Sequence, residues 1–184
     1  KSISDKTILI SVMYANNEIG NIYPVCEVVK IAKEHNILVH TDAVQAVGKI
    51  PVDVNDLGVD LLSFSSHKIY GPKGIGALYI RDGVKIDAFM HGGHQERGRR
   101  GGTENTIGIA GFGVAAKIAQ ERLLKDMNII KKLRDRLEKS ILGSVPDVVI
   151  NGNVENRVPG TTNLSFKYIE GEAILLNLDM YNIG

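Results

Sequence analysis

Residues 63–76 constrain the fold more than any other part of the chain. They read Ser-Phe-Ser-Ser-His-Lys-Ile-Tyr-Gly-Pro-Lys-Gly-Ile-Gly, with apolar runs at residues 59–64 and 75–80 on either side of the polar centre. This pattern predicts a strand, a polar corner, a turn and a second strand. Lys68 then follows a buried strand, and open α/β sheets place ligands at the carboxyl ends of their strands. A single loop lysine is usually a solvated charge, so its position alone does not define a site.

Apolar runs alternate with helical patterns around this stretch. Residues 8–12 and 37–40 predict two more buried parallel strands, and residues 24–33 carry apolar positions at helical spacing. Two helices are expected at residues 107–124 and 127–142. Strands at residues 148–150 and 162–166 and a helix at residues 173–180 follow. The alternation predicts an α/β fold with a mostly parallel sheet and flanking helices.

Asp42 comes at the end of the strand that precedes the Lys68 strand. Its carboxylate has an ordinary interpretation as the cap of the following turn. The alternative is that Asp42 and Lys68 reach one ligand from the ends of successive strands. Lysine forms Schiff bases once its amine is deprotonated, and a serine hydroxyl and a histidine before it are suited to hold a phosphate.

The stretch closely resembles the cofactor-lysine motif of cysteine desulfurases, which are pyridoxal phosphate (PLP) enzymes of the class V aminotransferase group. The resemblance runs from Asn-Asn-Glu-Ile-Gly at residues 16–20 to the last residue, with several motifs in the same order. It implies PLP fold type I, with residues 1–124 as the C-terminal part of the large domain. Residues 125–184 would begin the small α+β C-terminal domain.

The resemblance also implies roles for individual residues. Lys68 would carry PLP, Asp42 would pair with the pyridine nitrogen, and Gln45 would hydrogen-bond the ring hydroxyl. The other expected cofactor-binding residues are Asn17 beside the ring or the substrate carboxylate, Ser65 and His67 at the phosphate, and Thr103, given to the phosphate of a dimer partner. Lys68 and His67 are the candidates for proton transfer. Thr103 has a simpler interpretation as the N-cap of a helix.

The implied reaction converts L-cysteine to L-alanine and transfers the sulfur to an enzyme persulfide for iron–sulfur cluster assembly. A homodimer and iron–sulfur scaffold or sulfur-acceptor proteins are the implied partners. The family's persulfide cysteine lies on a mobile loop that this sequence does not contain, so we expect the chain to be an inactive fragment. Its one cysteine, Cys26, is expected to be buried in a helix and to be a poor nucleophile.

Alternatives remain open at this point. A selenocysteine lyase or another class V aminotransferase would share Asp42, Gln45 and Lys68, and a non-catalytic scaffold would keep the fold alone. A metal hydrolase would need more ligands than His91 and His94, which a flexible glycine pair separates, so no metal is expected. A net charge of +1 and the lack of a long apolar run give no indication of nucleic-acid or membrane partners. One cysteine is typical of a reducing compartment, and we expect a cytoplasmic protein.

Overall fold

A computed structural model describes residues 2–183 of the chain; residues 1 and 184, the ends of the two expected domains, lie outside the described residues. The first part of the chain forms a four-stranded sheet in the order β1-β2-β3-β4. Its strands are β1 (Leu9–Met13), β2 (Leu38–Asp42), β3 (Leu61–Ser65) and β4 (Gly76–Ile80). The first three strands are parallel and β4 runs antiparallel to β3, which confirms the predicted mostly parallel sheet.

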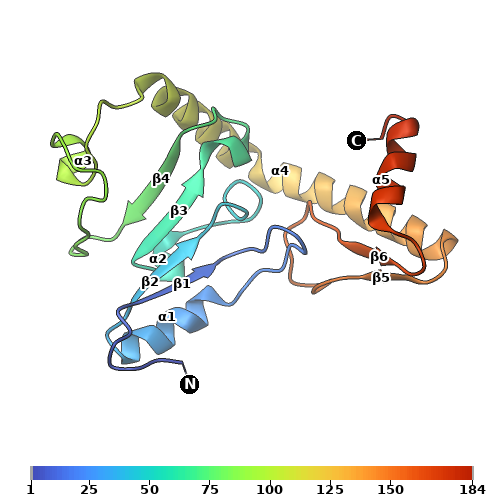
Figure 1. Ribbon diagram of the computed structural model, residues 1–184, viewed down its shortest axis with the longest axis horizontal. Helices are drawn as coiled ribbons and strands as arrows, with labels where there is room; N and C mark the ends of the chain where they lie inside the picture. The colour runs from blue at the N-terminus through green and yellow to red at the C-terminus, as the bar shows by residue number, and fades with distance from the viewer. Residues whose placement is uncertain (1, 184) are drawn as a thin grey trace.

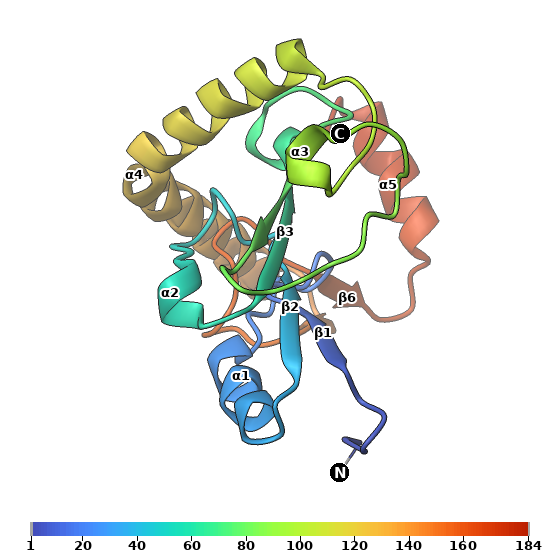
Figure 2. The same ribbon diagram turned by 90° about the vertical axis from the view of Figure 1, so that its left-hand side faces the viewer.

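Helices cover one face of this sheet. They are α1 (Val25–Glu34), α2 (Val54–Leu57) and the first part of α4 (Thr106–Ser144), and Figure 2 shows all three on the same side of the strands. Strand β2 reflects this arrangement, because Val39 and Thr41 are buried whereas His40 on the opposite face is partly exposed. The strand expected to be buried at residues 37–40 is therefore buried on the face that these helices cover.

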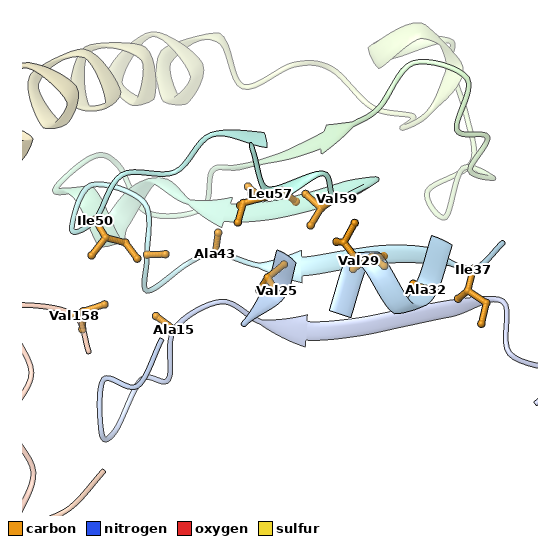
Figure 3. Close-up of a cluster of buried hydrophobic side chains, with 13 residues drawn as sticks. Ala15, Val25, Val29, Ala32, Ile37, Ala43, Ile50, Leu57, Val59 and Val158 are labelled. Atoms are coloured by element: carbon orange, nitrogen blue, oxygen red, sulfur yellow. The ribbon is translucent and has the colours of Figure 1, made fainter. Parts of the chain in front are cut away.

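The core lies between α1 and the covered face of the sheet. Val25, Val29 and Ala32 recur at intervals of four and three residues, so helix α1 presents them on one side. They belong to the same buried cluster as Val39 and Leu62 from the strands (Figure 3). Burying each valine contributes about 1.5–3 kcal/mol before chain entropy is counted. This burial holds the strands in place, and with them the polar residues that follow their carboxyl ends.

Helix α4 is one continuous helix of 39 residues, so the prediction of two helices is wrong. Lys125 and Asp126 interrupt the apolar pattern, but neither residue breaks a helix. Asp126 instead forms an ion pair with Arg122 one turn earlier, at 3.1 Å. Figure 1 shows α4 running from the sheet to the C-terminal elements, and the expected boundary between residues 124 and 125 falls inside it. None of the helices in the described part of the chain is both long enough and apolar enough to cross a membrane.

The C-terminal elements form a small separate sheet and a helix. Strands β5 (Val148–Ile150) and β6 (Leu164–Phe166) pair antiparallel, and α5 (Gly171–Met180) follows, as the sequence predicted. The segment between the two strands is held against α4 by a buried ion pair between Arg157 and Glu138, with 2.6 Å between Nη2 and Oε2. The Val158 side chain belongs to the main buried cluster, and its amide donates a hydrogen bond to the carbonyl oxygen of Gly20. The two parts of the chain are thus joined by packing as well as by α4.

Candidate active site

The carboxyl ends of β1, β2 and β3 meet at one edge of the sheet. Register pairs Met13 with Asp42 and Asp42 with Ser63, so the end of β2 lies between its two neighbours. Backbone hydrogen bonds continue past the strand ends, from the Tyr14 amide to the Asp42 carbonyl oxygen at 2.8 Å and from the Ala43 amide to the Ser63 carbonyl oxygen at 2.9 Å. The loops that leave this edge therefore start from fixed positions.

Asp42 has one carboxylate oxygen engaged and one available. Its Oδ1 accepts a hydrogen bond from the backbone amide of Val44 at 2.9 Å, so the capping role is present. Within residues 2–183 no hydrogen bond or ion pair engages Oδ2. A carboxylate oriented by its own turn, with one oxygen left over, is suited to accept a proton-bearing nitrogen from a ligand.

Lys68 lies on a tight turn just after β3. The turn is a short 3-10 helix, η1 (Ser66–Ile69), closed by Tyr70 at a φ of 64° and by a hydrogen bond from the Gly71 amide to the Ser66 carbonyl oxygen at 3.0 Å. A Cβ atom at Gly71 would lie 2.1 Å from Ser66 Oγ, so only glycine fits there. The Lys68 side chain is exposed, and in the described part of the chain its amine makes no hydrogen bond or ion pair.

Ser65 and His67 flank the start of this turn. Ser65 Oγ and His67 Nδ1 are hydrogen-bonded at 2.8 Å, and the histidine ring is exposed. This contact holds a hydroxyl and an imidazole together one to three residues before Lys68. Both groups can donate to the oxygens of an anion such as a phosphate.

Gln45 follows Asp42 in the turn after β2, and its amide oxygen accepts a hydrogen bond from the amine of Lys49. Lys49 is partly buried, and burial together with the nearby charge of Lys68 lowers the pKa of its amine. Sequence reasoning missed Lys49. The signal that would have found it is its spacing of four residues from Gln45, which places two side chains on the same side of a helical turn.

Asn17 and Thr103 are both exposed. Asn17 lies on the loop after β1, where the Oδ1 of the neighbouring Asn16 accepts hydrogen bonds from the amides of Glu18 and Ile19 at 2.9 Å each. Thr103 lines a cavity of about 840 Å³ together with Arg97 and Arg99. A second cavity, of about 820 Å³, is lined by Lys68 and Lys49. One chain therefore does not bring Thr103 to Lys68.

The helix-cap interpretation of Thr103 is wrong. Asn105 is the N-cap of α4, and its Oδ1 accepts a hydrogen bond from the amide of Gly108 at 3.0 Å. Before it, residues 95–98 form a single turn, α3 (Gln95–Gly98), that the sequence did not predict. Glu96 and Arg97 there have φ values of 49° and 58°, a left-handed backbone that propensity would not assign to these residues.

A polar row that sequence reasoning also missed crosses the open face of the sheet. The His40 ring bonds to Ser11 Oγ through Nδ1 at 2.8 Å and to Ser63 Oγ through Nε2 at 3.0 Å. Burial lowers the pKa of His40, although the nearby Asp42 charge partly opposes this. These hydrogen bonds link β1, β2 and β3 through His40, which lies two residues before Asp42. They therefore help to hold the end of β2, where Asp42 lies, against its two neighbouring strands.

The expectation that Cys26 is buried is wrong, because its side chain is exposed. Helix α1 turns Val25, Val29 and Ala32 into the core, and Cys26 lies one residue beyond Val25, about 100° around the helix axis. Its sulfur makes a weak contact, 3.8 Å from the carbonyl oxygen of Asp56.

The sequence matches the family described as "Aminotransferase class-V" over residues 1–184. It is 52% identical over 184 residues to a protein from Clostridium botulinum named "Cysteine desulfurase IscS". The alignment covers 99% of this chain and 46% of that protein. A protein of the same name from Dictyoglomus turgidum is 53% identical over 183 residues, with 46% of its length covered. The chain thus spans about half the length of the curated relatives it matches.

Solved structures give the same result. A structure titled "NIFS-LIKE PROTEIN" superposes with a TM-score of 0.93 at 43% identity, over 99% of this chain and 50% of that one. The crystal structure of DndA from Streptomyces lividans superposes with a TM-score of 0.84 at 35% identity, over 97% of this chain and 51% of that one.

Proposed function

The chain belongs to the class V aminotransferase family, and from that premise we propose that the protein is a pyridoxal phosphate-dependent cysteine desulfurase. The observation that carries this proposal is that two functional groups, an amine and a carboxylate, lie at the same edge of the sheet. Lys68 stands exposed on the turn after β3, and the unpaired oxygen of Asp42 stands at the end of the adjacent strand β2. The names of the relatives support cysteine as the substrate.

The residues present fit PLP by their chemistry. An exposed amine, Lys68, is available for attachment to the cofactor's aldehyde. The Asp42 carboxylate is oriented by the Val44 amide and keeps an oxygen for the pyridine nitrogen. Ser65 and His67 are joined to one another and supply donors for a phosphate. Each group therefore matches a different part of the cofactor.

When bound, PLP supplies an electron sink at the substrate's α-carbon. The roles of the protein's own groups follow from their placement. Asp42 would stabilise a proton on the ring nitrogen, and Gln45 would donate to the ring oxygen. Ser65 and His67 would hold the phosphate. Lys68 and His67 would move protons near the α-carbon. Asn17, on the loop after β1, would lie beside the ring or the substrate carboxylate.

We further propose that the functional unit is a homodimer. Thr103 lines a cavity separate from that of Lys68, and it lies beside Arg97 and Arg99. The cofactor phosphate of a second subunit would lie in that cavity, where Thr103, Arg97 and Arg99 supply donors and positive charge for an anion. Sulfur leaving the site would pass to an acceptor or iron–sulfur scaffold protein, and we place the protein in the cytoplasm. Residues 1–124 and 125–184 remain the proposed division between the large and small domains.

The substrate can be tested on the longest form of the protein that contains this chain, loaded with PLP. We expect L-cysteine and a thiol reductant to yield alanine and sulfide in equal amounts. The Lys68→Ala variant should not form these products over multiple turnovers. L-selenocysteine and other amino acids serve as competing substrates. Turnover of selenocysteine alone, or transamination without sulfide, would contradict the cysteine assignment while leaving the family intact.

A further inference from the structure

The hydrogen bond between Lys49 and Gln45 fixes which way the Gln45 amide faces. A lysine ammonium carries only donors, so the amide must turn its oxygen toward Lys49. The NH₂ group of Gln45 then points away from Lys49, and within residues 2–183 it donates to no other group. The orientation therefore follows from the hydrogen-bonding chemistry of the two groups.

The backbone of residues 43–50 holds these two side chains in place. The amides of Ala46 and Val47 both donate to the Ala43 carbonyl oxygen, at 2.9 and 3.0 Å, and the Lys49 amide donates to the Ala46 carbonyl oxygen at 3.0 Å. Gly48 packs so tightly on the Lys68 turn that a Cβ atom there would lie 2.6 Å from Ile69 Cγ2. The Lys49–Gln45 pair is thus fixed to the same structure that carries Lys68.

The surroundings of Lys49 differ from those of an ordinary surface lysine. Its side chain is partly buried, and no carboxylate in the described part of the chain lies within ion-pair distance of its amine. It shares a cavity of about 820 Å³ with Lys68, Arg122 and Asp126. Asp126 is already paired with Arg122 at 3.1 Å. Burial and the Lys68 charge both lower the pKa of Lys49, which indicates that this placement costs free energy.

We propose that Lys49 is a positioning residue of the cofactor site. It holds the Gln45 side chain so that the NH₂ group, rather than the oxygen, faces the cofactor and donates to the ring oxygen. This inference rests on the proposed function, because it assigns Gln45 to the cofactor ring. Lys49 acts only through Gln45 and makes no contact with substrate or cofactor.

The experiment compares Lys49→Met, which removes the donor, with Lys49→Arg, which keeps one. Lys33→Met on the outer side of α1 is the matched control, since it removes an exposed lysine outside the site. NMR relaxation of the Gln45 side-chain amide is measured first, without cofactor. We expect an ordered amide in the unaltered chain, in Lys49→Arg and in the control, and a mobile amide in Lys49→Met. Equal mobility in all four proteins would overturn the proposal.

PLP affinity is then measured for Lys49→Met, Gln45→Ala and the double variant. We expect Lys49→Met to weaken binding about three- to tenfold, as for the loss of one hydrogen bond, and to add nothing once Gln45 is alanine. Equal weakening in both backgrounds would mean that Lys49 acts on the cofactor directly, and would overturn the proposal. Failure of the unaltered chain to bind PLP would count against the proposed function, whereas the amide measurement still decides whether Lys49 orders Gln45.

Discussion

Asp42 and Ser63 are register partners on the adjacent parallel strands β2 and β3. Ser63 lies only five residues before Lys68, and the intervening turn is closed by hydrogen bonds at both ends, with Ser66 donating to the Ile75 carbonyl oxygen and Gly71 donating to that of Ser66. The carboxylate and the amine are therefore held at the same sheet edge by backbone pairing. Under the proposed function both groups would contact PLP from neighbouring strands, at the carboxyl edge where α/β sheets place their ligands.

Replacing Asp42 by alanine should weaken the binding of PLP about tenfold or more, because a charge-assisted hydrogen bond to the ring nitrogen is lost. Asp87→Ala, which removes an exposed carboxylate outside the site, is the control and should bind as the unaltered chain does. Fluorescence titration with PLP measures both. Equal affinity for the Asp42 and Asp87 variants would show that Asp42 does not contact the cofactor.

Two glycines of α4 should respond in opposite directions to alanine. At Gly111 a Cβ atom would lie 2.6 Å from Cγ of Pro72 in the Lys68 turn, whereas at Gly113 nothing lies within 4 Å. Gly111→Ala should therefore destabilise the chain by about 1–3 kcal/mol through overpacking. Gly113→Ala should stabilise it by up to about 1 kcal/mol through helix propensity. Urea unfolding of the two variants measures this, and the same sign for both would refute the packing of α4 on the turn.

Glu138 should make stability depend on pH. Burial alone would raise its pKa, but the hydrogen bond from Arg157 and the charges of Arg157 and Arg134 hold the pKa of Glu138 below its usual value. A lowered folded-state pKa contributes stability that is present above the unfolded pKa of about 4.3 and is lost as the pH falls through the folded value.

Glu138→Gln should therefore cost about 3 kcal/mol at pH 7, because it leaves the buried Arg157 charge unpaired. The difference from the unaltered chain should shrink below about pH 4.3. Glu121→Gln, in an exposed pair with Lys117, is the control and should change little. Urea unfolding across this pH range is the measurement, and a cost that stays constant with pH would contradict the ion-pair account.

Cys26 should react as an exposed thiol. Its side chain is exposed, so a disulfide reagent such as DTNB should titrate one thiol in the folded chain without denaturant. Cys26→Ser should remove the reaction and leave the far-UV circular dichroism spectrum unchanged. A thiol that reacts only after urea is added would restore the expectation of a buried cysteine.

The sequence predicted the sheet because its strands are short apolar runs with clear ends. The polar residues after the runs, Asp42 and Lys68, became candidates because each follows the end of an apolar run and because the Lys68 stretch resembles the cysteine desulfurase motif. The length of α4 was missed because Lys125 and Asp126 break the apolar period without breaking the helix. Hydrophobic periodicity reports packing faces, and it does not report helix ends that lack glycine, proline or caps.

Side-chain direction and pairing were harder to predict than the fold. Cys26 was expected to face the core, although a change of one residue turns a helical side chain by 100°. The buried contact between Arg157 and Glu138 joins segments nineteen residues apart in sequence, and no local spacing indicates it. Lys49 and Gln45 are four residues apart, but many such pairs on helices are solvated. Only the burial of Lys49 beside the Lys68 turn distinguishes this one.

Borohydride reduction of the chain after incubation with PLP, followed by peptide mapping, tests the central claim most directly. The structure offers two lysines in one cavity, Lys49 and Lys68, and a third, Lys73, exposed on the loop beyond. We predict that the reduced cofactor is found on Lys68 alone and that Lys68→Ala abolishes the label. A label on Lys49 or Lys73, or one spread over several lysines at similar yield, would contradict the assignment of Lys68 as the cofactor lysine.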